Sequence, residues 1–222
     1  LKNLLPKILK SRGNKIVLTE LEHHSNLLPW QQLSIRENFN LEFIKINPDF
    51  CLDLEDAKEK IDKNCTLLSL AHVSNAVGTR NNLKELAKIS RLNNTLICVD
   101  AAQSIGHFEV NVKDLDCDFL VFSSQKVFGP SGIGILYIKK EHIGKLSPFL
   151  FGGGIVKDIN LNEILYLSDN KKFEAGTQNI EGVISLRYSL NYLSNIGLKN
   201  IEEYNKYLLN YAIKKLKKIK KI

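Results

Sequence analysis

The sequence predicts an α/β protein built on a mostly parallel β-sheet. The first indication is a set of short apolar runs rich in β-branched residues, at 15–19, 42–46, 66–73, 95–100, 119–124 and 134–140. The second is that segments with helical spacing separate several of these runs. Strands that alternate with helices favour a parallel sheet with both faces covered. Ligands of such sheets bind at the carboxyl ends of the strands, so polar residues there are the candidates for function.

Each element is predicted from its own pattern. The apolar runs have the length of buried strands and are too short for buried helices. Between them, the segment 52–61 would place Leu54, Ala57 and Ile61 on one helical face. The segment 81–92 likewise carries aliphatic residues on one face, and it begins with asparagines that can cap a helix.

Length and composition indicate a soluble globular chain. The 222 residues have room for one large α/β domain, or one and a fraction, and the 44% hydrophobic and 25% charged residues are ordinary values. No apolar run approaches the roughly 18 residues of a membrane span, and the start does not read as a signal peptide. Because the chain has no Met and begins at Leu1, we expect a processed chain or a piece of a longer protein.

The net charge of +7 is concentrated at the carboxyl end. Residues 205–222 carry seven lysines and no acid, so the rest of the chain sums to zero. Apolar residues recur there at helical spacing, which predicts an amphipathic helix with a lysine face. Such a helix could bind nucleic acid or a membrane surface, or it could pack on a core that this chain lacks. The last interpretation is favoured, since only five of the 31 basic residues are arginine. We therefore expect neither nucleic acid nor membrane as a partner.

The cysteines give no sign of a metal or redox site. Their positions are Cys51, Cys65, Cys98 and Cys117, and no two have the C-x-x-C spacing. No cluster of carboxylates or histidines completes a metal ligand set, so no metal is expected. Ser123 and Ser124 lack the G-x-S-x-G context of a nucleophile.

Polar residues follow four of the predicted strands. They are His23, His24, Asn75, Asp100, Gln103, Ser123, Gln125 and Lys126. Singly, each can be a surface, turn or capping residue. Together they suit pyridoxal phosphate, because a lysine amine can form a Schiff base with its aldehyde and an aspartate can keep its pyridine nitrogen protonated. Lys126 ends an apolar run, where desolvation of an ammonium would be costly, and we expect a functional reason for it.

Longer stretches carry a resemblance to a known family. They are "ELEHHSNLLPWQ" (20–31), "LAHVSNAVGT" (70–79), "VDAAQSIGHFEVNVKDLDCDFLVFSSQKVFGPSGIGILYIKK" (99–140), "FGGGIVKDI" (151–159) and "FEAGTQNIEGVISL" (173–186). The chain resembles the pyridoxal-phosphate-dependent class V aminotransferases, and among them the SufS-type (group II) cysteine desulfurases. The resemblance implies a type I fold, with a seven-stranded large domain over 1–193, truncated at its amino end, and the start of a small domain over 194–222.

The resemblance also implies roles for single residues. Lys126 would form the Schiff base, Asp100 would pair with the pyridine nitrogen and His23 would stack on the ring, with Lys126 and His23 as the catalytic residues. The other cofactor-binding residues would be Asn75 and Gln103 at the ring's 3-oxygen side, Ser123 and Gln125 at the phosphate, and Thr177 at the phosphate of the partner subunit in a homodimer.

The implied reaction converts L-cysteine, or L-selenocysteine, to alanine and leaves a persulfide on the enzyme. A SUF-type acceptor protein would take this sulfur for iron–sulfur cluster assembly, in the cytoplasm or in a plastid-type organelle. The alternatives are another class V enzyme (a selenocysteine lyase, an aminotransferase-like enzyme or an epimerase) and a non-catalytic remnant that uses the lysine helix.

The sequence departs from the family pattern in two respects. Gln125 stands where the family has a histidine that helps to bind the phosphate, which predicts weaker cofactor binding. The persulfide cysteine, the arginine for the substrate carboxylate and an upstream Gly-Thr-Thr loop are expected outside these residues, so we expect this chain alone to be inactive.

Overall fold

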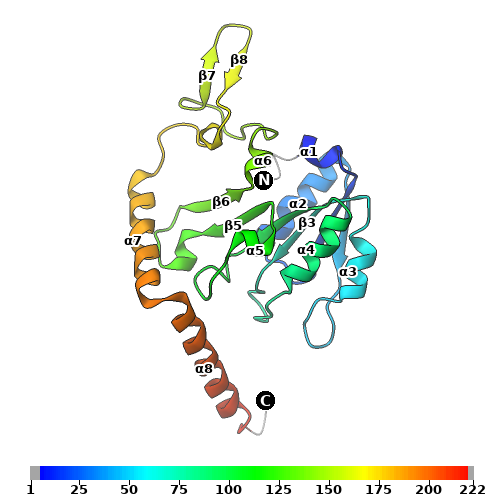
Figure 1. Ribbon diagram of the computed structural model, residues 1–222, viewed down its shortest axis with the longest axis vertical. Coiled ribbons are helices and arrows are strands. Elements are labelled where there is room, and N and C mark those ends of the chain that lie inside the picture. Colours follow the sequence, from blue (N-terminus) through cyan, green and yellow to red (C-terminus); the bar gives the residue numbers. More distant parts are fainter. Residues whose placement is uncertain (1–5, 220–222) are drawn as a thin grey trace.

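The computed structural model describes residues 6–219, and a six-stranded sheet forms its centre (Figure 1). The strands are β1 (Lys15–Thr19), β2 (Asn40–Ile44), β3 (Cys65–Ala71), β4 (Leu96–Asp100), β5 (Phe119–Ser123) and β6 (Gly134–Ile138). Their order is β2-β1-β3-β4-β5-β6; the first five are parallel, and β6 is antiparallel to β5. The prediction of a mostly parallel sheet is confirmed, with one strand fewer among these residues than the seven that the resemblance implies.

Helices cover both faces of this sheet, as predicted (Figure 1). The helices are α1 (Pro6–Lys10), α2 (His24–Glu37), α3 (Leu54–Lys60), α4 (Leu83–Leu92), α5 (Val112–Leu115), α6 (Lys140–Ile143), α7 (Ile180–Ile196) and α8 (Leu198–Leu216), with the short 3-10 helices η1 (Ser124–Val127) and η2 (Asn170–Phe173). Alternate residues of β1 enter different cores. Val17 packs with α3, α4 and α5, whereas Ile16 and Leu18 pack with α1 and α2.

Helix α2 was not predicted, because the residues on its buried face are not a clear apolar pattern. The residues buried on that face are Asn26, Trp30, Leu33 and Ser34. They have helical spacing, but half of them are polar, and Pro29 lies inside the helix. The side chain of His23 caps the helix by accepting a hydrogen bond from the Ser25 backbone N–H.

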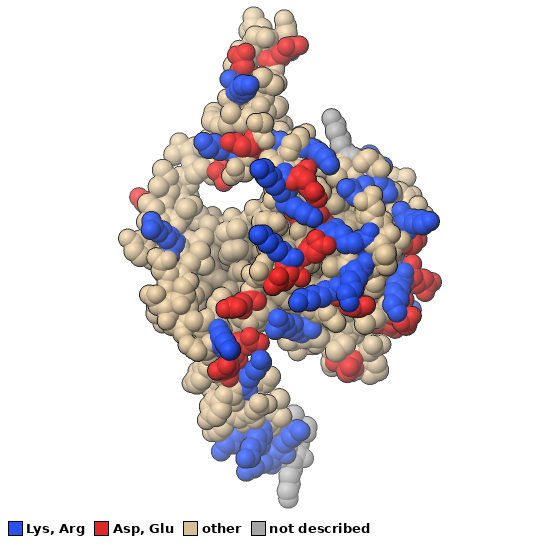
Figure 2. Space-filling view, in the orientation of Figure 1, with Lys and Arg blue, Asp and Glu red and all other residues tan. Residues whose placement is uncertain are grey.

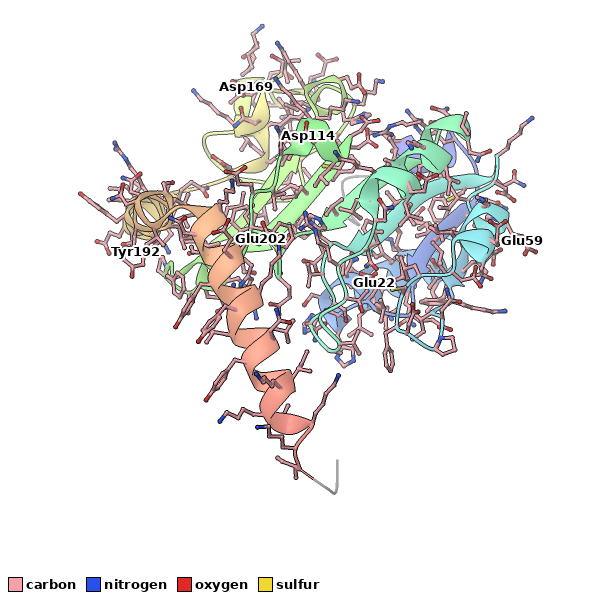
Figure 3. The ribbon with its side chains drawn as sticks, turned by 60° about the horizontal axis from the view of Figure 1, so that its bottom comes forward. Glu22, Glu59, Asp114, Asp169, Tyr192 and Glu202 are labelled. Atoms are coloured by element: carbon pink, nitrogen blue, oxygen red, sulfur yellow. The ribbon has the colours of Figure 1, made fainter. Side chains whose placement is uncertain are left out.

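The chain after β6 leaves the sheet as separate elements. The hairpin of β7 (Val156–Ile159) and β8 (Ile164–Tyr166) projects at one end of the molecule (Figure 1). Tyr192 on α7 lies at the left of the sheet in Figure 3 and Glu59 on α3 at its right, so α7 and α3 flank opposite edges. Gly197, with a φ of 86°, separates α7 from α8.

The predicted amphipathic helix is present as the second half of α8. The apolar residues of α8 from Tyr204 onward are exposed, namely Tyr204, Tyr207, Leu208, Leu209, Tyr211, Ile213 and Leu216, and so is Ile219, which follows the end of the helix. Its lysines gather at the far end of the helix (Figure 2), and the last two of the seven lie outside the described residues. None of the helices between residues 6 and 219 combines the length and the apolar composition needed to cross a membrane.

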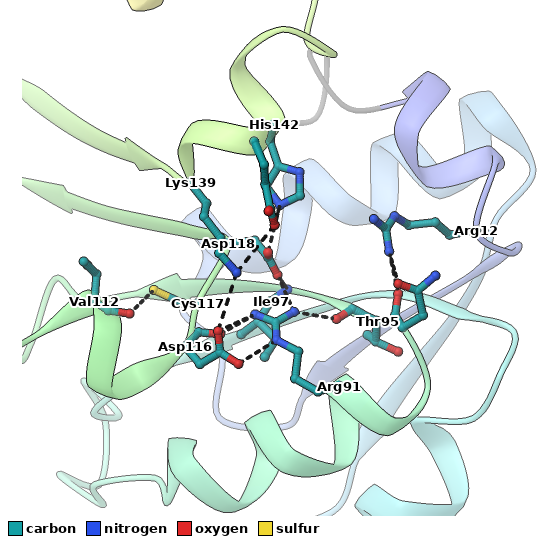
Figure 4. A network of polar contacts seen from close by, with 12 residues as sticks. Arg12, Arg91, Thr95, Ile97, Val112, Asp116, Cys117, Asp118, Lys139 and His142 are labelled. Atoms are coloured by element: carbon teal, nitrogen blue, oxygen red, sulfur yellow. Dashed lines mark hydrogen bonds and ion pairs between the residues drawn. The ribbon is translucent and has the colours of Figure 1, made fainter.

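A buried ion network fixes the amino end of β5 (Figure 4). Asp118 is 1% exposed, and its Oδ2 accepts hydrogen bonds from Arg91 Nη1 and from the Ile97 backbone N–H, each at 2.8 Å. Its Oδ1 lies 2.8 Å from Nε2 of the buried His142. Arg91 also binds Asp116 at 2.8 Å. Both oxygens of Asp118 are therefore occupied by partners on α4, β4 and α6.

We predict that Arg91→Met destabilises the protein by about 3–5 kcal/mol, because it removes the cationic partner of a buried carboxylate. The matched control is Lys88→Met on the same helix, whose ion pair with Glu85 is exposed and is worth about 1 kcal/mol or less. Urea unfolding of both variants measures the difference. Equal losses would contradict the prediction.

Candidate active site

The strand order creates a crevice between β1 and β3. The chain leaves β1 through α2 on one face of the sheet, whereas it leaves β3 toward α4 on the other face. Connections that depart to opposite faces open a gap at the carboxyl ends of the two strands, where parallel sheets bind ligands. A cavity of about 530 Å³ lies there and extends over the ends of β4 and β5. This volume falls within the range of small-molecule sites.

Seven of the eight residues predicted for the site line this cavity. They are His23, Asn75, Asp100, Gln103, Ser123, Gln125 and Lys126. The eighth, Thr177, is exposed in the loop before α7 and lies outside the cavity lining. The sequence therefore predicted which side chains converge, while their chemical roles stay predictions.

Lys126 is placed differently from the sequence expectation. The apolar strand ends at Ser123, and Lys126 lies on the following 3-10 helix η1, where it is exposed. The expectation of a desolvated ammonium was wrong, since this turn carries the side chain out of the strand and toward the open cavity. Its backbone is held closely: a Cβ on Gly106 would lie 2.8 Å from the Lys126 carbonyl oxygen. Only glycine allows this approach.

Asp100 is the last residue of β4 and is half-buried. Its Oδ1 accepts a hydrogen bond of 2.9 Å from the Ala102 backbone N–H. Burial raises the pKa of Asp100, while the Ala102 N–H and the charges of His23 and Lys126 oppose the rise. The carboxyl group thus shares the cavity with the Lys126 amine and the His23 ring and is suited to a ligand that carries an N–H.

His23 presents its ring at the amino end of α2. Its Nδ1 accepts a hydrogen bond of 3.2 Å from the Ser25 backbone N–H and lies 3.0 Å from Ser25 Oγ. These contacts fix the ring at the cavity wall. The next residue, His24, lines an adjoining hollow of about 340 Å³ rather than the main cavity.

A polar hollow of about 270 Å³ continues from the main cavity. Ser123 and Gln125 line both spaces, and Ser131 and Gly132 are added in the hollow. Hydroxyl and amide donors beside glycine backbone are the groups that bind a phosphate. This end of the site therefore offers an anion-binding surface, and the Asp100 end offers a carboxylate.

The sequence reasoning missed Glu22, which lies beside the main cavity and lines the adjoining hollow (labelled in Figure 3). Its Oε1 accepts hydrogen bonds from Thr19 Oγ1 at 2.5 Å and from the Ala71 backbone N–H at 3.1 Å, and its Oε2 accepts one from Asn26 Nδ2 at 2.5 Å. Burial raises the pKa of Glu22 to about 7 against these hydrogen bonds, and the charge of Asp100 adds to the rise. The sequence feature that could have indicated Glu22 is an acidic residue between a buried strand and the candidate residue His23.

Comparison with known proteins assigns the chain to a family. The family model described as aminotransferase class-V matches residues 1–222. The chain belongs to the class V aminotransferases. Enzymes of this family depend on pyridoxal phosphate.

The similar proteins include cysteine desulfurases. A cysteine desulfurase of Escherichia coli K12 is 40% identical over 208 residues, which are 93% of this chain and 51% of the relative. The apo structure of a cysteine desulfurase from Thermococcus onnurineus is 42% identical, with a TM-score of 0.91 over 98% of this chain and 55% of that chain. The E. coli cysteine desulfurase CsdA is 30% identical with a TM-score of 0.92 over the same shares. The chain spans about half the length of the curated relatives it matches.

The residues at the cavity fit the family's cofactor. A carboxylate, an amine and an imidazole lie at one end, and phosphate donors lie at the other. Asp100 receives one hydrogen bond among residues 6–219, from Ala102, so it keeps lone pairs for a pyridine N–H. The polar groups at the two ends of the cavity thus suit the pyridine and the phosphate of the class V cofactor, and the cavity has room for it.

We predict a pH dependence of stability from Glu22. Because the pKa of the folded state, about 7, lies above the unfolded value of 4.5, the stabilising contribution is complete below about pH 4.5 and is lost as the pH rises to about 7. The unfolding free energy of the wild type, compared with that of Glu22→Gln, should fall by about 3 kcal/mol over this range. Chemical denaturation at several pH values measures it.

The control is Glu20→Gln, which removes the same charge two residues away, from a carboxylate that accepts a hydrogen bond from the Ile46 backbone N–H. Because Glu20→Gln retains Glu22, its unfolding free energy should keep the wild-type fall between about pH 4.5 and 7. A wild-type minus Glu22→Gln difference that stays constant with pH would contradict the prediction.

Proposed function

We propose that this chain forms the cofactor-binding part of a pyridoxal-phosphate-dependent cysteine desulfurase. The main observation in support is that Asp100, at the end of β4, and Lys126, just after the adjacent parallel strand β5, line one cavity. The names of relatives that are 40% identical support the choice of reaction. Within this proposal the enzyme is of the SufS type, uses L-cysteine or L-selenocysteine, and supplies sulfur for iron–sulfur clusters through a SUF-type acceptor in the cytoplasm.

The proposed roles follow the positions of the side chains. The Lys126 amine would hold the cofactor through its aldehyde and could carry a proton at Nζ, and the Asp100 carboxylate would accept a hydrogen bond from the pyridine nitrogen. His23 covers the ring from α2. Asn75 and Gln103 contact the 3-oxygen side of the ring, and Ser123 with Gln125 donates to the phosphate, while Thr177 reaches the phosphate of the partner subunit. When bound, pyridoxal phosphate withdraws electrons from the substrate carbon.

The cysteines of this chain do not suit the sulfur-accepting step. Burial raises the pKa of Cys65 and Cys98 to about 12 and that of Cys117 to about 11, so their thiolates are scarce. Cys51 is exposed, but it does not line the cavity. We propose that the persulfide thiol comes from another part of the protein, and that residues 1–193 and 194–222 belong to a large and a small domain of a homodimer.

A covalent capture experiment tests the proposed role of Lys126. Incubation with pyridoxal phosphate followed by borohydride should attach the cofactor to the peptide that contains Lys126, as read by mass spectrometry. Lys126→Ala should lose this adduct, whereas Lys113→Ala, which removes an exposed lysine on α5, should keep it. Labelling that is spread over surface lysines, or no labelling, would overturn the cofactor proposal. Alanine release from L-cysteine by the whole protein tests the reaction itself.

The residue next to Lys126 gives a further prediction. Gln125→His should strengthen pyridoxal phosphate binding about five-fold below pH 6.5, because an imidazolium donates a charge-assisted hydrogen bond to the phosphate. Gln32→His on the exposed side of α2 is the control and should leave affinity unchanged. Equilibrium titration of cofactor absorbance gives both values. An unchanged or weaker dissociation constant for Gln125→His would count against the phosphate role of this position.

A further inference from the structure

Glu22 is a half-buried acid for which the proposed reaction has no role. It follows β1 at the point where β1 and β3 separate. The parallel pairing of β1 with β3 ends at Val17 and Leu68, although β3 continues to Ala71. Beyond that point the Glu22 carboxyl accepts the Ala71 backbone N–H at 3.1 Å. A side chain thus continues the connection between the strands at the floor of the crevice.

The other oxygen of Glu22 binds α2 through an amide whose orientation is fixed. Asn26 Oδ1 accepts hydrogen bonds from Trp30 Nε1 at 2.9 Å and from Ser69 Oγ at 2.7 Å. Its Nδ2 must therefore point to Glu22 Oε2, at 2.5 Å. Asn26 is 5% exposed, and its backbone N–H closes the first turn of α2 on the His23 carbonyl at 2.8 Å.

Two of the three hydrogen-bond partners of Glu22, Asn26 and Ala71, belong to the cavity wall. Asn26 and Ala71 line the cavity, together with His23, which precedes the first turn of α2. Thr19 can donate its hydroxyl hydrogen to the carboxylate or accept one from the protonated acid, so the geometry holds in either charge state.

We propose that Glu22 is a positioning residue that ties the first turn of α2 to the end of β3 and so holds His23 over the cofactor ring. This inference deepens the proposed function and rests on it for the identity of the ligand. The contacts that carry it belong to the unliganded protein, which allows a test that does not need the cofactor.

An exchange of donor and acceptor tests the Glu22–Asn26 hydrogen bond. Glu22→Gln places an amide N–H₂ against the Asn26 N–H₂, and Asn26→Asp places a carboxylate against Glu22. The double variant restores one donor facing one acceptor and keeps the wild-type net charge. Glu20→Gln is the control for loss of charge on the same loop.

The first readout is hydrogen exchange of the backbone amides at positions 26 and 71 in the unliganded protein. Each single variant should exchange about ten-fold faster at position 26, and the double variant should return close to the wild-type rate. Glu22→Gln keeps a carbonyl for Ala71, so position 71 should stay protected in that variant. Glu20→Gln should match the wild type at both positions.

The second readout is the dissociation constant of pyridoxal phosphate, which should weaken about ten-fold in each single variant and recover in the double variant. Wild-type exchange rates in the single variants, no recovery in the double variant, or unchanged cofactor affinity in the single variants would each overturn the proposal. If the wild type itself binds no pyridoxal phosphate, the proposed function fails, while the exchange rates still decide whether Glu22 holds α2 to β3.

Discussion

The reversal of strand order between β1 and β3 is the constraint on which the site depends. Parallel strands bring their carboxyl ends to one edge, and the reversal sends the following helices to opposite faces. Residues far apart in the sequence then meet without any long loop, with His23 after β1, Asp100 at the end of β4 and Lys126 after β5. The antiparallel strand β6 runs back along β5, and its first residues close the same cavity.

Two carboxylates at opposite ends of the sheet, the buried Asp118 and the half-buried Asp100, differ in how many hydrogen bonds they accept. Asp118, at the amino end of β5, has both oxygens occupied by an arginine, a histidine and a backbone N–H. Asp100, at the carboxyl end of β4, receives one backbone N–H among residues 6–219. Partial burial of a carboxylate whose lone pairs lack hydrogen-bond donors costs free energy. A ligand N–H that donates to such a carboxylate recovers this cost, which favours binding. A carboxylate that accepts few hydrogen bonds from the protein, like Asp100, is therefore a candidate for ligand binding.

Much of the fold was predictable because the central strands are buried: β3 is buried at every residue and is therefore mostly apolar, with Thr66 and Ser69 as its polar residues. The site residues were predictable because they follow such runs. The features that were not predicted, namely the buried face of α2 and the contacts of Glu22, depend on residues that are distant in sequence. The face of α2 is half polar because Asn26 bonds Ser69, and the importance of Glu22 depends on Ala71. Lys126 was misjudged because a 3-10 turn, rather than a continued strand, sets its exposure.

The charge at the carboxyl end also has a local explanation. Lys214 and Lys215 lie in the last turn of α8, where the helix dipole favours cations, and Lys217 and Lys218 follow directly. The unusual feature of α8 is instead its many exposed tyrosines and aliphatic residues, and α7 exposes apolar residues as well. Exposed apolar side chains in such number are typical of a surface that packs against protein, whereas phosphate binding requires cations along the contact face. The helix is therefore better explained by its apolar residues than by its lysines.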